Sequence, residues 1–257
     1  MGAAERVEVW IAAPRPGAGT RGRSESGAAI AGVPGSGLGD VLDAVERDRT
    51  AAMEPGRRAA FVTARALLRC VLAMRLGCAP GEVRLDARCQ CGRPHGPVTV
   101  LPEGPWVSLS RNGPLVAVAL RAEGPVGVDL ASISAVASAP LTGLLPMTLP
   151  GGASTTAEPG ERPAEELARA WVRTEATLKL LRTGLRRDPA EVRIDGSGLA
   201  RIDGRRVARL SDLPPDPCLG PEVVGAVAID GPRAAHVVLE DGSALLDRLL
   251  RPDLAAQ

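Results

Sequence analysis

Short apolar stretches, several of them alternating with polar residues, are spread along the chain and predict many strands. They are bounded by Gly, Pro, Asp and Asn, the residues that favour turns. Strands are expected at 7–13, 82–89, 97–102, 106–110, 115–121, 125–133, 191–195, 200–203, 205–210, 223–229 and 234–241.

Three further segments carry apolar residues at helical spacing and predict helices at 39–49, 57–77 and 164–184. The second is the strongest, and Gly77 ends it. Its apolar positions are Phe61, Ala64, Leu68, Val71, Leu72 and Leu76. A Gly-, Ser- and Arg-rich loop is expected at 15–39, and a low-complexity region at 134–160.

The order strand, long helix, antiparallel meander occurs twice, which predicts an α+β protein. We expect a pseudo-dimer of two similar halves, each a long helix packed on a small antiparallel sheet. The halves are placed at 1–122 and 123–257. No repeat is visible at the level of residues, so the duplication is inferred from the order of elements alone.

Composition and charge exclude several classes of protein. The 257 residues are 45% hydrophobic and 24% charged, as in ordinary globular proteins. A net charge of +1 gives no general reason to expect nucleic-acid binding. No apolar run is long enough for a membrane span, and the N-terminus does not resemble a secretion signal. The five cysteines show no disulfide spacing, so we expect reduced thiols and a cytoplasmic location. Because two similar halves are expected in one chain, we expect a monomer.

Lys179 is the only lysine in a chain with 31 basic residues, and it follows Glu175 by one helical turn. A surface ion pair would explain the spacing, but an arginine would serve there equally well. A compact ammonium is suited to act as a point charge against a phosphate, which is the alternative interpretation.

Other polar residues stand at the ends of predicted strands. Asp129 follows an apolar strand segment and is expected to project from the end of the strand. There it caps the following turn or, together with Glu175, holds a hard cation such as Mg²⁺. Ser110 and Arg111 end another strand and suit phosphate oxygens. Arg57 and Arg65 lie on the long helix, as solvated charges or as phosphate anchors.

Taken in order, five stretches resemble the motifs of the Sfp-type 4′-phosphopantetheinyl transferases. The stretches are "RRAAFVTAR" (57–65), "CQCGRPHGPV" (89–98), "SLSRNGPLVAVAL" (108–120), "GVDLA" (127–131) and "WVRTEATLKLLRTGL" (171–185). The resemblance covers the chain from about residue 40 to residue 240.

The resemblance implies transfer of 4′-phosphopantetheine from coenzyme A to a serine of an acyl or peptidyl carrier protein, with Mg²⁺, in a cleft between the halves. It implies that Asp129 and Glu175 hold the metal and that Glu175 or a metal-bound water takes the serine proton. It implies catalytic Lys179 on the bridging phosphate, Arg57 and Arg65 on the 3′-phosphate, and Ser110 and Arg111 near the pyrophosphate.

The chain departs from the family pattern at several positions. Ala131 and Arg111 replace an acidic residue and a histidine, and Pro97 directly follows His95 and Gly96 where a lysine is expected. Thr174 replaces a lysine, and Arg182 replaces a glycine. The alternative is therefore a relative that binds coenzyme A or a carrier protein without the standard transfer. The run Arg182, Arg186 and Arg187 is either a solvated helix end or a patch for an acidic carrier protein.

Cys89, Cys91 and His95 are possible zinc ligands. Structural zinc sites usually take four ligands from two separated pairs, and no second pair is visible in the sequence. A turn-rich structural segment is the preferred interpretation.

Overall fold

The computed structural model describes residues 5–13, 37–139 and 164–250 and is a mixed α+β fold. Its α-helices are α1 (Ala44–Ala51), α2 (Pro55–Leu76), α3 (Ile133–Ala137), α4 (Ala164–Leu180) and α5 (Gly242–Leu250). Its strands are β1 (Arg6–Ala12), β2 (Arg84–Asp86), β3 (Thr99–Leu101), β4 (Trp106–Asn112), β5 (Leu115–Arg121), β6 (Val126–Ser132), β7 (Arg193–Ile194), β8 (Leu199–Ile202), β9 (Arg205–Asp212), β10 (Val223–Ile229) and β11 (His236–Asp241). Short 3-10 turns are η1 (Leu38–Val41), η2 (Pro80–Glu82), η3 (Gly184–Arg186) and η4 (Pro189–Glu191).

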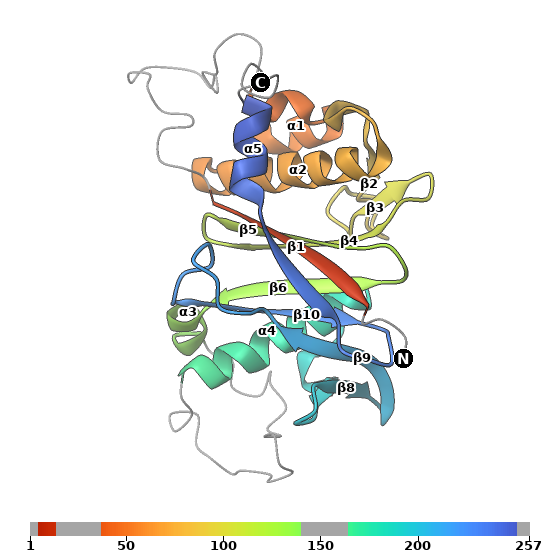
Figure 1. The fold of residues 1–257 in the computed structure, drawn as a ribbon, viewed down its shortest axis with the longest axis vertical. Helices are drawn as coiled ribbons and strands as arrows, with labels where there is room; N and C mark the ends of the chain where they lie inside the picture. The colour runs from red at the N-terminus through yellow and green to blue at the C-terminus, as the bar shows by residue number, and fades with distance from the viewer. Residues whose placement is uncertain (1–4, 14–36, 140–163, 251–257) are drawn as a thin grey trace.

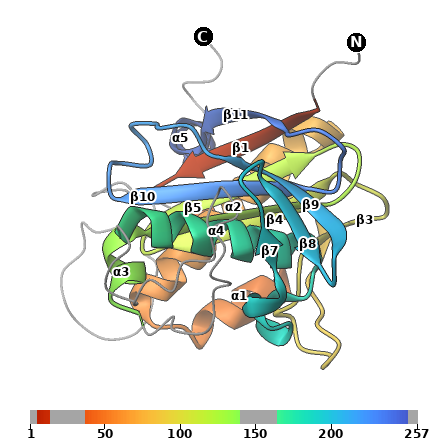
Figure 2. The same cartoon turned by 90° about the horizontal axis from the view of Figure 1, so that it is seen from below.

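Two larger sheets lie face to face between helices (Figure 1). The first has the order β11-β1-β5-β4 and the second the order β6-β10-β9-β8-β7, while β2 and β3 form a separate pair. Helices α2 and α5 cover the outer face of the first sheet, and α4 covers the outer face of the second, as Figure 2 shows from below. The described part of the chain contains no helix that is both long and apolar enough to cross a membrane.

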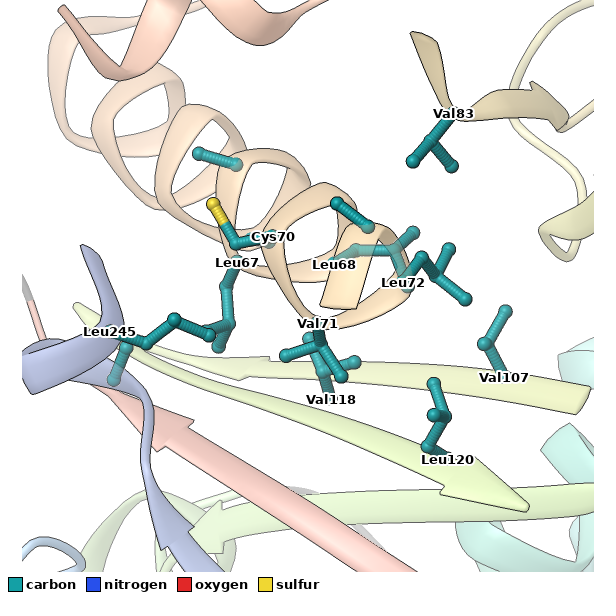
Figure 3. Packing of buried hydrophobic residues seen from close by; sticks show 14 of the residues in the cluster. Leu67, Leu68, Cys70, Val71, Leu72, Val83, Val107, Val118, Leu120 and Leu245 are labelled. Carbon is teal, nitrogen blue, oxygen red and sulfur yellow. The ribbon is translucent and has the colours of Figure 1, made fainter. Parts of the chain in front are cut away.

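All residues of strand β5 are buried, so both faces of the strand contribute to the hydrophobic core. Val118 and Leu120 pack toward α2 (Figure 3), and Val116 belongs to the same cluster. The alternate residues Leu115, Ala117 and Ala119 join a second cluster, which includes residues of β6 and β10. This second cluster is the core between the sheets. A third cluster lies between the second sheet and α4.

The last strand, β11, pairs with β1 in parallel, with His236 opposite Arg6. The other pairings within the two larger sheets are antiparallel. Helix α5 then packs beside α2, where Leu245 and Leu246 enter the first core. The predicted boundary at residues 122/123 lies in the connection between β5 and β6, yet residues 236–250 pack with the first sheet.

Several expectations about individual elements need correction. The helix expected at 39–49 begins at Ala44, because Asp43 and Glu46 form an N-terminal capping box. The strands expected at 82–89 and 97–102 are shorter and form their own hairpin instead of joining the first sheet. Helices α3 and α5 were not expected. Most of the expected loop at 15–39 and of the low-complexity region at 134–160 lies outside the described residues.

Candidate functional site

A cavity of about 440 Å³ lies between α2, β4, the loop before β3 and the C-terminal end of α4. Six cationic side chains line it: Arg49, Arg65, Arg111, Lys179, Arg182 and Arg186. None of the described residues that line it is acidic. A concave site of this size with several cationic side chains on its walls is suited to a ligand that carries several negative charges.

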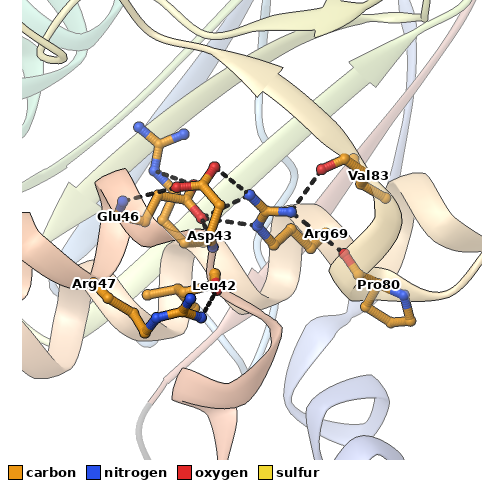
Figure 4. A network of polar contacts seen from close by, with 8 residues as sticks. Leu42, Asp43, Glu46, Arg47, Arg69, Pro80 and Val83 are labelled. Carbon is orange, nitrogen blue, oxygen red and sulfur yellow. Dashed lines mark hydrogen bonds and ion pairs between the residues drawn. The ribbon is translucent and has the colours of Figure 1, made fainter.

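A buried polar network around Arg69 and Glu46 (Figure 4) also contacts Arg65, one of the residues that line the cavity. Arg69 is fully buried, and its guanidinium donates to Glu46 Oε2 at 2.8 Å, to Asp43 Oδ2 at 2.8 Å and to the carbonyl of Val83 at 2.6 Å. Arg65 Nε lies 3.5 Å from the other oxygen of Glu46. The buried Glu46 is thus shared between two arginines, and it fixes the position of Arg65 at the cavity wall.

Three arginines surround Phe61, the only phenylalanine of the chain, on the wall of the cavity. The guanidinium carbons of Arg49, Arg65 and Arg111 lie 4.7, 5.3 and 6.0 Å from the ring centroid. Burial, opposed by the attraction of Glu46 and reinforced by the neighbouring arginines, lowers the pKa of Arg65 to about 10. Burial, together with nearby arginines, also lowers the pKa values of Arg49 and Arg111.

Arg65 Nη1 is a buried donor without a hydrogen-bond partner among the described residues. An unpaired charged donor is costly to bury, so its presence beside like charges points to an anion as the missing partner.

Lys179 uses all three of its ammonium protons. Its Nζ donates to Asp129 Oδ1 at 2.7 Å, to the carbonyl of Val128 at 3.0 Å and to the carbonyl of Leu109 at 3.1 Å. Leu109 belongs to β4, whereas Val128 and Asp129 belong to β6, so α4 is tied to a strand of each larger sheet. Three acceptors around one point match an ammonium and not the planar fork of an arginine. This contact accounts for the single lysine structurally.

Asp129 is buried and is held from the first sheet as well. Ser110 Oγ donates to Asp129 Oδ1 at 2.8 Å and accepts from the backbone N–H of Leu130 at 3.1 Å. Ser108 accepts from the N–H of Val128 at 3.0 Å in the same manner. Strands β4 and β6 belong to different sheets and form no backbone ladder with each other. Two serine side chains of β4 instead accept hydrogen bonds from N–H groups of β6.

Glu175 is the carboxylate of the site that lacks a strong partner. Burial raises its pKa, and the negative charge of Asp129 raises it further, while Lys179 opposes the shift. Its Oε1 is buried without a hydrogen-bond partner among the described residues. An orphaned carboxylate oxygen near a second carboxylate fits a hard divalent cation such as Mg²⁺, for which Asp129 and Glu175 would be the protein ligands.

Gly127 explains how α4 and β6 come so close. A Cβ built on Gly127 would lie 1.9 Å from the carbonyl oxygen of Ala176 and 2.6 Å from the N–H nitrogen of Leu180. Any larger residue would push the strand off the helix. The glycine two residues before Asp129 thus allows the contact between Asp129 and Lys179.

Arg182 stands where the resembling family has a glycine, and its backbone has a φ of 58° in the left-handed region. A glycine adopts this conformation without strain, whereas other residues do so at a cost. The side chain offsets that cost by donating to the carbonyls of Pro97 and Val98 and, at 2.7 Å, to Thr99 Oγ1. Arg182 therefore joins the end of α4 to the loop before β3.

The structure brings most of the residues singled out in the sequence to one region. Arg65, Arg111 and Lys179 line the cavity. Asp129 and Ser110 contact each other, and Asp129 also contacts Lys179. Arg57 is exposed and does not line the cavity, although its charge lowers the pKa of Arg111.

Arg49 is a cavity residue that sequence reasoning missed, and no motif marks it. Arg186 was considered only as part of a basic patch, although it also lines the cavity.

Ala131, at the position of the family's further acidic residue, is buried in the core between the second sheet and α4. It therefore adds no polar group to the site.

Cys89, Cys91 and His95 meet at the rim of the cavity. One ligand atom from each lies within 4.8 Å of the others, and Cys91 Sγ is 3.0 Å from His95 Nε2. Hydrogen bonds with the backbone of Cys91 are the main cause that lowers the pKa of Cys89. The five cysteines are all free thiols.

Comparison with known proteins does not identify a relative: no protein-family model matches the chain, and no curated protein matches it significantly.

Proposed function

We propose that the chain binds coenzyme A with its phosphates in the cationic cavity. The observation that carries this proposal is the cluster of Arg49, Arg65 and Arg111, which share one wall of the cavity while Arg65 keeps a buried, unpaired donor. Phosphate oxygens accept charge-assisted hydrogen bonds from arginine forks and would relieve the repulsion among the three guanidinium groups.

We further propose that the bound coenzyme A donates its 4′-phosphopantetheine group to a serine hydroxyl of a carrier protein. In this step the serine oxygen forms a bond to phosphorus, the bond to the adenosine 3′,5′-bisphosphate leaving group breaks, and the serine proton goes to a base. Glu175 is suited to be that base, because its raised pKa and unpaired Oε1 favour accepting a proton. Asp129 orients Lys179 toward the cavity that holds the phosphates.

Mg²⁺ bound by Asp129 and Glu175 would neutralise charge on the pyrophosphate.

In the proposal the protein is a cytoplasmic monomer built as a pseudo-dimer. Its two similar halves are supported by the pair of large sheets, each with one long helix on its outer face. Free thiols support a reducing compartment. The exposed Leu185, flanked by the basic run at the end of α4, is suited to an acidic carrier-protein helix.

A second candidate function is binding of coenzyme A or a carrier protein without transfer. The observation in its favour is that Lys179 already satisfies its three protons within the protein, with Asp129 as its ion-pair partner. A lysine engaged in this way holds the fold together and has no proton left for a phosphate.

The test is incubation of the protein with an apo-carrier protein, coenzyme A and Mg²⁺, followed by mass spectrometry of the carrier protein. The expected result is a mass increase equal to one phosphopantetheine group. Glu175→Gln and Asp129→Asn should abolish the product. Glu166→Gln is the matched control, since it makes the same change at an exposed position of α4 and should retain activity.

Calorimetric titration with coenzyme A separates the two candidate functions. Arg65→Gln should weaken binding by at least about 10-fold, which is the loss of one charged hydrogen bond. The exposed Arg84→Gln should leave binding unchanged. Binding of coenzyme A without a mass shift of the carrier protein supports the second candidate. Absence of coenzyme A binding overturns the first candidate and the coenzyme A form of the second, and a titration with the carrier protein then tests the form that remains.

A further inference from the structure

The loop between β2 and β3 folds three soft ligands into one cluster. Cys89, Cys91 and His95 come together because the chain reverses tightly between them: the N–H of Cys89 donates to the carbonyl of Arg93 at 2.8 Å. The N–H groups of Gly92 and His95 donate within the same turn, to the carbonyls of Cys89 and Arg93. Backbone bonds thus hold the three side chains on one side of the loop.

The base of this loop leaves no room for a larger residue. The N–H of Gly96 donates to the carbonyl of Ala87 at 2.6 Å, and a Cβ on Gly96 would lie 2.6 Å from the carbonyl oxygen of Arg88. Only glycine permits this approach. The backbone is therefore shaped to bring His95 back over the two cysteines.

We propose that Cys89, Cys91 and His95 bind a zinc ion. Tetrahedral zinc with sulfur and nitrogen ligands places neighbouring ligand atoms about 3.5 to 3.8 Å apart, given bond lengths of about 2.0 to 2.3 Å. The three ligand atoms lie within 4.8 Å of one another, with Cys91 Sγ 3.0 Å from His95 Nε2, so side-chain rotations suffice to reach this geometry.

The charge of the cluster suits zinc and not Mg²⁺. Two thiolates and a neutral imidazole balance a divalent ion, and soft sulfur ligands select zinc over hard cations. Arg186 Nη1 lies 3.9 Å from Cys89 Sγ, where it can stabilise a metal-bound thiolate, and it also donates to Gln90 Oε1 at 3.2 Å. Three protein ligands leave a fourth position for an oxygen ligand, which is water in the free protein.

The zinc would fix one wall of the cavity, because Cys89, His95 and the following residues 96–98 line it. The site depends on none of the residues assigned to group transfer, so its presence can be tested whether or not transfer occurs.

The first test is titration of the reduced protein with Zn²⁺ against a chromophoric chelator, together with Co²⁺ substitution. One zinc per chain and the thiolate-to-cobalt and ligand-field bands of a tetrahedral site are expected. Cys89→Ser, Cys91→Ser and His95→Gln should each weaken zinc binding by more than about 100-fold, beyond the effect of an outer-shell change. Cys218→Ser, an exposed cysteine away from the loop, is the control and should bind as the unaltered protein does.

The second test uses the exposed Arg88 inside the loop. Zinc should slow tryptic cleavage after Arg88 at least about 10-fold in the unaltered protein, as expected when a bound metal is linked to local folding, and not in Cys91→Ser. Equal zinc affinity in the loop variants and the control, an octahedral cobalt spectrum, or a native Cys89–Cys91 disulfide that excludes zinc would each overturn the proposal.

Discussion

Replacement of Gly127 by alanine tests the contact on which the site is built. The new Cβ would lie 1.9 Å from the carbonyl oxygen of Ala176, whereas carbon and oxygen without a bond between them approach to about 3.3 Å. Strand and helix must therefore separate by roughly 1.4 Å. Both partners are backbone, held by the β6–β10 ladder and by the helix, so no side chain can rotate out of the way.

Gly127→Ala should lower the free energy of unfolding by about 3 kcal/mol, the upper end of the range for overpacked cores. In a chain of this size that corresponds to a fall in Tm of roughly 6 to 12 °C. The same separation would stretch the ion pair between Lys179 and Asp129 from 2.7 Å to beyond hydrogen-bond distance. Asp129→Asn should consequently cost less in the Gly127→Ala background than in the unaltered protein.

Thermal and urea unfolding followed by circular dichroism measure both effects. Gly56→Ala, on α2, is the matched control because its added Cβ meets no atom within 4 Å, and it should be neutral or gain up to about 1 kcal/mol. If Gly127→Ala unfolds at the same temperature as Gly56→Ala, the close packing of β6 on α4 is wrong, and with it the derivation of the site.

Substitutions at three further positions address other parts of the structure. Because burial raises the pKa of Glu175, folding favours its protonated form, and the stability associated with that form is lost as the pH rises through the folded pKa. Glu175→Gln should therefore raise the urea midpoint near pH 7 but not below about pH 4, the ordinary range of glutamate, and equal effects at both pH values would contradict this. Arg182→Gly and Arg182→Ala both lose the hydrogen bonds to residues 97–99, but only glycine adopts the left-handed backbone without strain. The glycine variant should therefore be more stable than the alanine variant by about 1 kcal/mol in urea unfolding. Equal stability of the two variants would disprove the strain. Arg69→Met leaves Glu46 and Asp43 without their buried partner and should lower the free energy of unfolding by about 3 to 5 kcal/mol. Arg69→Lys should not restore the stability, because an ammonium cannot reproduce the contacts of the guanidinium fork. A loss below about 1 kcal/mol would show that the network is not coupled.

The role that the resemblance implies for Lys179, a contact with a phosphate, stays a prediction. In the structure Lys179 donates to three protein oxygens and also lines the cavity. The positive charge available to a ligand comes mainly from arginines. One of them, Arg49, lies on a helix whose start at the Asp43–Glu46 capping box could have been inferred from the sequence.

The long helices and most strands follow from the sequence because local periodicity decides them: α2 has its apolar face at helical spacing, and β5 is apolar on both faces because both are buried. Asp129 and Glu175 could likewise be chosen as polar residues on an apolar strand and an apolar helix, but the expectation that Asp129 projects from the end of its strand is wrong, because Asp129 lies inside β6 and pairs with Ala226 of β10.

Only the tertiary structure decided which distant segments meet. The parallel pairing of β11 with β1 joins residues more than two hundred positions apart, and no local pattern encodes a strand's partner. The buried, unpaired donor of Arg65 and the three acceptors of Lys179 arise in the same way. Each depends on the packing of side chains from separate elements, a property of the assembled core and not of any stretch of sequence.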